Sequence, residues 1–299
     1  MIKSFKKYFL SPFAETLKKL RFSHLYLSAN YLLRKSIISD NVNFRKSDVS
    51  IIKRELGFAK INFKKNKNFQ KLKKYTKRKF PPKVVIKKSG NKSKDSFLKI
   101  HSIDVFKHKE ILDFLEDKDF QEILSSYLKS TPILTHTSIW YSKNKTTSPQ
   151  SSQLFHFDRE DRYQLKVFIP IYPIFNDSGP LTLLSSKQSS DFIRTSLLKF
   201  SLISLKDRIL DSTVKQRLGA FKPFKLTANE GEIIFADTTN CLHYGSRNSI
   251  KPKYHLTIQF LSIYSYKLKN FIKKYNEHKR SGIDSFSYMK WQKENDKLH

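Results

Sequence analysis

The chain has few of the residues that hold small or secreted domains together. It contains one cysteine, Cys241, in 299 residues, which excludes an internal disulfide and favours a reducing compartment. No stretch reaches the roughly 18–20 uninterrupted apolar residues of a membrane-spanning helix. The basic start of the chain also lacks an apolar core followed by a cleavage site. We therefore expect a cytoplasmic protein, with Cys241 as a small buried hydrophobe.

Acidic residues and glycine are also scarce. The chain has 26 Asp and Glu against 58 Lys and Arg, and only 7 glycines, and its net charge is +32. Positions 1–94 carry 27 basic and 4 acidic residues, or +23, whereas positions 95–299 carry 31 and 22, or +9. Such a charge suits an anionic membrane surface, an acidic substrate or nucleic acid, but AT-rich coding would produce the same lysine-rich composition. No zinc-ligand spacing or RNA-binding motif accompanies the lysines, which argues against a nucleic-acid partner.

The chain divides by composition into three parts. Residues 1–94 are expected to form a basic, partly helical extension. Its segment 1–40 has apolar residues at helical spacing, which suits either a peripheral membrane contact or, as we favour, an ordinary helix that packs on the domain. Residues 64–94 are rich in lysine and interrupted by proline and glycine, which indicates a poorly structured connector. Residues 266–299 are expected to form a basic helical tail.

Residues 95–265 have the pattern of a folded domain. A helical pattern from Ile103 to Leu128 gives way to short runs of β-branched and aromatic residues bounded by turn residues. These runs cover 133–141, 163–171, 181–184, 232–235 and 254–262. So many short strands predict a sandwich or barrel, interrupted by a helical insertion near 187–218.

One short motif in this domain carries chemistry. His156 and Asp158 are two residues apart, so on a strand both side chains point to the same face. His243 follows another expected strand, 232–235. Two imidazoles and a carboxylate can hold one face of an Fe(II) ion and leave the opposite positions open. A histidine two residues before an aspartate is common by chance, and most histidines in folded domains are structural, so the motif depends on this context.

Several segments resemble the phytanoyl-CoA dioxygenase family of Fe(II)- and 2-oxoglutarate-dependent oxygenases. The matching runs, in order, are 153–169, 176–184, 231–237, 243–248 and 254–260. The resemblance implies a mainly β fold with flanking helices around a double-stranded β-helix, the jelly-roll or cupin-like core. It also implies that His156, Asp158 and His243 are the catalytic iron ligands, that 2-oxoglutarate is the co-substrate, and that O2 oxidises an unactivated C–H bond. Ser185-Ser-Lys-Gln departs from the family's pattern in a loop on the substrate side.

The resemblance also implies a cation for the far carboxylate of 2-oxoglutarate. The matching position holds Lys253, which supplies the charge but not the planar fork of an arginine. Arg247 is the alternative cation, or else it forms a salt bridge in its loop. Lys166 is a third cofactor-binding candidate, with a role toward co-substrate or substrate, or else it is a lysine on the barrel exterior.

The substrate class stays open at this point. Family members oxidise lipids and other small molecules, so the resemblance implies a small-molecule or lipid-like substrate. The basic surface is compatible with a substrate that is anionic or linked to an acyl carrier. The alternative is a double-stranded β-helix that binds ligands without catalysis, and a basic nucleic-acid-binding protein ranks below it. An intact triad favours the enzyme, because a domain without catalysis has no need for it.

Overall fold

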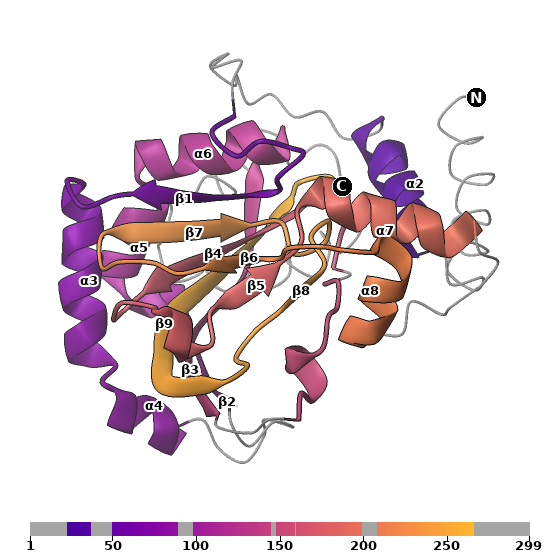
Figure 1. The fold of residues 1–299 in the computed structure, drawn as a ribbon. Coiled ribbons are helices and arrows are strands. Elements are labelled where there is room, and N and C mark those ends of the chain that lie inside the picture. The colour runs from indigo at the N-terminus through magenta and orange to yellow at the C-terminus, as the bar shows by residue number, and fades with distance from the viewer. Residues whose placement is uncertain are drawn as a thin grey trace.

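Two antiparallel sheets form the centre of the protein (Figure 1). The computed structural model describes residues 23–36, 50–88, 98–144, 148–158, 160–198 and 208–265. The larger sheet has the order β1 (Phe58–Asn62), β7 (Glu232–Ala236), β4 (Gln164–Pro170), β9 (Ser249–Ser262), β3 (Pro132–Asn144) and β2 (Leu98–Ser102). The smaller sheet has the order β6 (Phe224–Leu226), β5 (Leu181–Leu183) and β8 (His243–Tyr244).

The chain passes repeatedly from one sheet to the other. It leaves the larger sheet after β4, returns at β7, crosses to β8 and returns again at β9. Side chains from both sheets form one apolar cluster, in which Phe168 and Ile234 of the larger sheet meet Leu183 and Leu226 of the smaller one. This arrangement is the expected double-stranded β-helix core with flanking helices.

Alternation along the strands separates two interiors. On β4, Leu165, Val167 and Ile169 face a core shared with helices, whereas Phe168 faces the smaller sheet. The helices on that side are α3 (Lys67–Lys79), α4 (Pro82–Lys88), α5 (Lys109–Leu115) and α6 (Lys118–Leu128). Strands that are buried on both faces read as continuous apolar runs. The residues on the other face of each strand therefore point into the space between the two sheets.

Of the remaining helices, one also packs on the core shared with helices, through Tyr31, and two pack on a separate apolar cluster through Phe192 and Val214. They are α2 (Ser23–Lys35), α7 (Ser186–Leu198) and α8 (Asp211–Leu218), and three 3-10 turns span Val105–Lys107, Ser151–Gln153 and Asn176–Ser178. No helix within the described ranges is long and apolar enough to cross a membrane. The rest of the expected N-terminal helices, the 266–299 tail and the middle of the 187–218 insertion lie outside the described residues.

The lysine-rich segment after residue 64 corrects our expectation of a poorly structured connector. Residues 67–79 and 82–88 are helical, and the Asn66 side chain caps α3 by accepting a hydrogen bond from the Phe69 amide at 2.8 Å. Phe69, Leu72 and Thr76 recur on one face and are buried, so apolar spacing outweighs the lysines between them. The larger sheet also begins before residue 95, because β1 pairs with β7.

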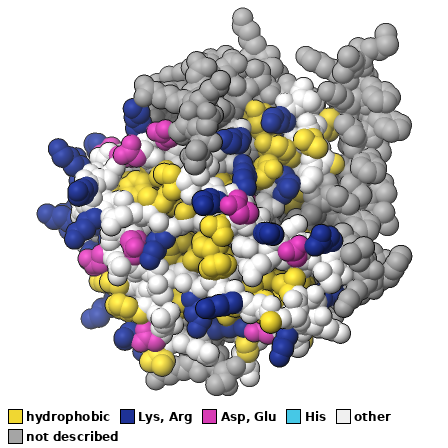
Figure 2. All heavy atoms as spheres, turned by 45° about the horizontal axis from the view of Figure 1, so that its top comes forward, with side chains coloured by type: hydrophobic (Ala, Val, Ile, Leu, Met, Phe, Trp, Pro, Cys, Tyr) yellow, Lys and Arg dark blue, Asp and Glu magenta, His cyan; other side chains and the backbone are white. Residues whose placement is uncertain are grey.

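Basic side chains are dispersed over the face of the protein that Figure 2 draws. Figure 2 shows Lys and Arg spread across one face among fewer Asp and Glu. Some of these lysines pair with carboxylates near the edge of the larger sheet: Lys77 lies 2.6 Å from Glu230, and Lys60 lies 3.2 Å from Glu232. Exposed pairs of this kind contribute little to stability.

Candidate metal centre

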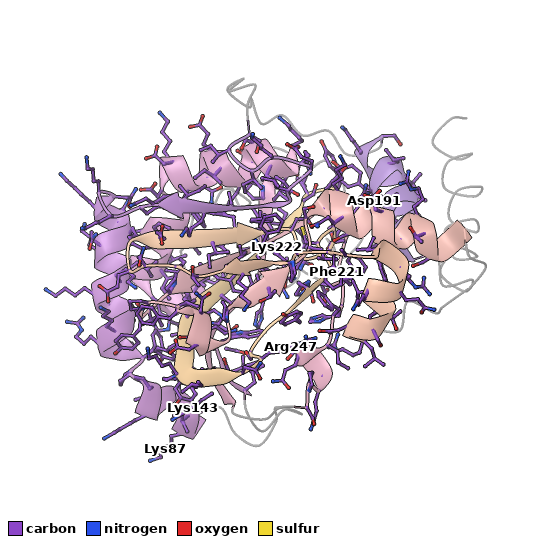
Figure 3. All side chains as sticks on the ribbon, in the orientation of Figure 1. Lys87, Lys143, Asp191, Phe221, Lys222 and Arg247 are labelled. Carbon is purple, nitrogen blue, oxygen red and sulfur yellow. The ribbon has the colours of Figure 1, made fainter. Side chains whose placement is uncertain are left out.

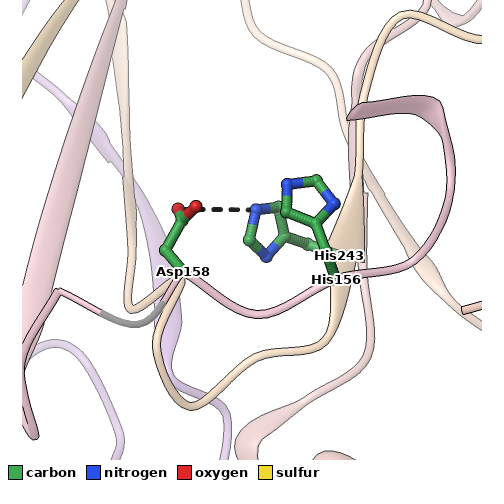
Figure 4. A group of neighbouring side chains, drawn as sticks. All are labelled: His156, Asp158 and His243. Carbon is green, nitrogen blue, oxygen red and sulfur yellow. Dashed lines mark ion pairs between the residues drawn. The ribbon is translucent and has the colours of Figure 1, made fainter. Parts of the chain in front are cut away.

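Backbone pairing brings the three expected ligands together. His156 and His243 form an antiparallel bridge in which each amide donates to the other's carbonyl, at 2.9 and 3.0 Å. The Asp158 amide donates to the Thr238 carbonyl at 3.0 Å. His156 thus lies in an isolated bridge beside β8, whereas we expected it on a longer strand with Asp158. The ligand atoms of His156, Asp158 and His243 all lie within 4.8 Å of one another (Figure 4).

Main-chain carbonyls fix the tautomers of both histidines. The Nδ1 of His156 lies 2.8 Å from the Leu154 carbonyl, and the Nδ1 of His243 lies 2.9 Å from the Cys241 carbonyl. A carbonyl can only accept, so each Nδ1 carries a hydrogen. Burial and then the nearby His243 lower the pKa of His156 to about 3, and burial lowers the pKa of His243 although Asp158 opposes it. Both rings are therefore neutral at pH 7 and present an unprotonated Nε2, the form that binds a metal.

Asp158 is held as a carboxylate by its neighbours. Burial alone would raise its pKa, but Lys166, with the two histidines, holds the pKa of Asp158 well below its usual range. The Lys166 ammonium donates to Oδ2 of Asp158 at 2.6 Å, and that oxygen lies 3.6 Å from Nε2 of His243. Lys166 is thus inside the barrel, not on its exterior, and contacts a candidate metal ligand directly.

The three ligands line a cavity of about 200 Å³ between the sheets. Trp140, Phe168 and Ile174 are among its apolar walls, and Lys166, Arg208 and Lys253 bring positive charge. The volume is below the roughly 300–1,000 Å³ of sites for drug-sized ligands. The described part of the cavity is therefore suited to a metal ion and a small acidic molecule.

Lys253 reaches this cavity from β9. Its side chain is buried, and its ammonium donates to the Gly179 carbonyl at 2.8 Å. Burial lowers the pKa of Lys253 to about 7. A buried ammonium with one carbonyl partner among the described residues is well placed to receive an anion. The anion's negative charge would raise the pKa of Lys253 again and keep it protonated.

Arg247 is engaged elsewhere. Its side chain is labelled in Figure 3. The guanidinium donates two hydrogen bonds to Asp211 at the start of α8, at 2.7 and 2.8 Å, and lies 3.6 Å above the Tyr244 ring. Its Nε donates to the Gln153 carbonyl. Among the described residues that line the cavity, Lys253 is present and Arg247 is not. Of the two candidate cations, Lys253 alone is placed beside the triad.

Sequence reasoning missed two titratable residues that line the cavity. His255 lies two residues after Lys253, and Arg208 lies within the helical insertion, shortly before α8. The positive charge of Arg208 acts on both histidines of the triad, lowering the pKa of each. The alternation along β9 could have revealed His255, because residues 253 and 255 share one face of a strand.

Comparison with known proteins yields only distant structural likenesses. No protein-family model matches the sequence, and no curated protein matches it. The apo form of EctD from S. alaskensis has a TM-score of 0.49 at 9% identity, covering 76% of this chain and 81% of its own. The alpha ketoglutarate dependent epimerase SnoN has a TM-score of 0.48 at 10% identity, covering 72% of this chain and 81% of its own. HygX from Streptomyces hygroscopicus, with nickel and 2-oxoglutarate bound, has a TM-score of 0.45 at 8% identity, covering 70% of this chain and 83% of its own. At these identities the likeness concerns the path of the chain only.

Proposed function

We propose that the protein is an Fe(II)- and 2-oxoglutarate-dependent dioxygenase of the phytanoyl-CoA dioxygenase family. In the proposed reaction the substrate C–H becomes C–OH, while 2-oxoglutarate and O2 are converted to succinate and CO2. The observation that carries the proposal is the convergence of two neutral imidazoles and one carboxylate in a buried cavity. Two histidines and one carboxylate with open positions form the donor set typical of non-haem Fe(II) oxygenases.

The residues present fit such a metal. His156 and His243 would each ligate through Nε2, and Asp158 through a carboxylate oxygen, with Lys166 holding the other side of that carboxylate. Bound iron would supply the sites at which 2-oxoglutarate and O2 react. The protein's own part is to hold the ligands in the neutral and ionised forms the metal needs and to exclude water from the cavity.

The co-substrate would lie between the triad and Lys253. Its keto-acid end would face the metal, and its far carboxylate would accept a hydrogen bond from the buried Lys253 ammonium. Binding would replace the hydration that Lys253 has lost through burial. This role belongs to Lys253 and not to Arg247, because Asp211 already occupies the guanidinium of Arg247.

The substrate would be a small or lipid-like molecule with an anionic group. Lys166, Lys253 and Arg208 give the cavity lining more positive than negative charge, since Asp158 is its only acidic residue among those described. An acyl group on an acidic carrier has the required charge. We further propose that the oxygenase domain extends from β1 to β9, with 187–218 as its helical insertion. The peripheral membrane contact through the N-terminal helices and the cytoplasmic location stay predictions.

Anaerobic metal and co-substrate binding tests the proposal. Fe(II) and then 2-oxoglutarate are added to the purified protein, and we expect a weak visible charge-transfer band from the chelated co-substrate. His156→Ala, which removes one ligand, should lose the band. Folded, metal-loaded protein without a band would contradict the proposal and favour a binding module without catalysis. A band would justify a substrate screen by succinate release.

A further inference from the structure

We propose that His255 is a ligand-recognition residue that, together with Lys253, binds the far carboxylate of the co-substrate. The inference rests on the proposed function and assigns a role to a side chain outside the metal triad. It follows from the position of His255 on β9, from its lack of hydrogen-bond partners among the described residues and from the buried ammonium beside it.

His255 faces the space between the sheets. Along β9, Tyr254, Leu256 and Ile258 belong to the core under the helices, so the alternate residues 253, 255 and 257 face the opposite side. The His255 ring lies across from Trp140, its neighbour on β3, at 6.0 Å between ring centroids, and 5.6 Å from Phe168 of β4. Two aromatic side chains thus hold the imidazole in place at the cavity wall.

The imidazole has no hydrogen-bond partner in the described part of the chain. His255 is 2% exposed, yet neither Nδ1 nor Nε2 has a partner among the described residues. About 90% or more of buried polar groups in proteins are hydrogen-bonded, so such a group calls for an explanation. Of the described side chains with buried, unpartnered atoms, His255 alone lines the cavity. A ligand in the cavity would supply the missing partner.

Lys253 determines what kind of ligand group this is. It shares the strand face with His255 and makes one hydrogen bond to a described residue, the Gly179 carbonyl. Burial and then the charge of Lys253 hold the pKa of His255 well below its usual range, so the ring is neutral and has one N–H to donate. An ammonium and an N–H donor from adjacent side chains suit the two oxygens of one carboxylate. Together they replace the two-pronged contact that an arginine would make alone.

The test compares two keto acids that differ in one group. 2-Oxopentanoate has the chain of 2-oxoglutarate with a methyl group in place of the far carboxylate. The dissociation constants of both would be measured anaerobically on Fe(II)-loaded wild type, His255→Phe and His255→Gln. Thr257→Val is the matched control, because Thr257 is the next residue on the same face of β9 and its unpartnered hydroxyl does not line the cavity. Metal affinity and melting temperature verify that each variant is folded.

We expect His255→Phe to weaken the binding of 2-oxoglutarate by about tenfold or more, because a hydrogen bond to a charged group is lost. The dissociation constant of 2-oxopentanoate should change less than twofold in the same variant. His255→Gln should regain much of the lost affinity for 2-oxoglutarate because it keeps an N–H donor. Thr257→Val should bind both keto acids as the wild type does. Equal weakening of both keto acids, or no weakening of either, would overturn the assignment while leaving the proposed function intact. Failure of the metal-loaded wild type to bind either keto acid would overturn both.

Discussion

His156 and His243 exchange both of their backbone hydrogen bonds, and their rings lie 4.2 Å apart between centroids. Residues that exchange both bonds form a hydrogen-bonded antiparallel pair, which fixes their relative position and the side to which their side chains point. The spacing between the two candidate ligands is therefore a property of sheet pairing. Their use as ligands is the first point to test.

Removal of either imidazole should abolish tight metal binding. We expect His156→Ala and His243→Ala each to weaken binding of Fe(II) or Ni(II) by about 100-fold or more, since loss of even an outer partner of a ligand costs roughly 10–100-fold. Calorimetry under anaerobic conditions measures the effect. His108→Ala is the control, because His108 bonds to Tyr75 on the helical side of the larger sheet. Equal affinity in all three variants would place the metal elsewhere.

Lys166→Met should tighten metal binding about tenfold. The Lys166 ammonium lies 2.6 Å from Oδ2 of Asp158, so it repels a divalent cation and shares the same carboxylate. This repulsion is worth a few kcal/mol at an effective dielectric of about 20. Loss of the charge-assisted hydrogen bond to Asp158 offsets about 1.5–3 kcal/mol of it, which leaves a gain of about tenfold. Competition against a fluorescent chelator gives the affinity.

Lys60→Met serves as the control for Lys166→Met, because Lys60 pairs with Glu232 outside the cavity. Metal affinity should be unchanged in that variant. Weaker metal binding by Lys166→Met would instead mean that Lys166 is needed to orient Asp158.

Co-substrate affinity should fall as pH rises above 7. Burial lowers the pKa of the free Lys253 ammonium to about 7, and a bound carboxylate would raise it by favouring the charged form. Between these two values binding takes up a proton, so affinity decreases by up to about tenfold per pH unit. Titrations at pH 7, 8 and 9 on the Fe(II)-loaded protein measure the slope. Lys253→Arg, which stays charged, should lose the slope, and a slope retained in that variant would assign the proton to another group.

Arg247→Ala should spare the co-substrate and reduce stability. We expect a loss of about 1 kcal/mol in the free energy of unfolding, because the Asp211 partner is largely exposed and the stacking on Tyr244 adds a small cation–π contribution. Lys253→Ala should instead raise the 2-oxoglutarate concentration needed for succinate release. Denaturant unfolding and co-substrate titration separate the two effects. An increased co-substrate requirement in Arg247→Ala alone would reverse our assignment.

Strands with an apolar run could be predicted from the sequence, including the three-residue β5 within 181–184, whereas β1 and β8 could not. The expected strands at 163–171 and 254–262 correspond to β4 and β9, because they are buried on both faces and read as apolar runs. β8 contains two residues, too few to show any periodicity. β1 alternates only weakly in burial because it is an edge strand. The pairing of each depends on distant residues.

Within the site, spacing and the family resemblance pointed to the side chains but not to their partners. The separation of His156 and Asp158 and the position of Lys253 were visible in the sequence. The ion pair of Arg247 with Asp211 was not, because it depends on where the insertion returns to the sheet. The contact of Lys166 with Asp158 likewise requires knowing which face of β4 is turned toward the smaller sheet.

The carbonyls that orient both imidazoles belong to the main chain, at Leu154 and Cys241. A carbonyl is present whatever residue occupies the position, so substitution at either place leaves the orienting hydrogen bond available as long as the backbone keeps its path. The surroundings of the triad can therefore diverge widely in sequence while the two histidines keep their protonation and aim. Evolutionary drift around such a centre is tolerated, and selection needs to retain little more than the triad and the pairing of its strands.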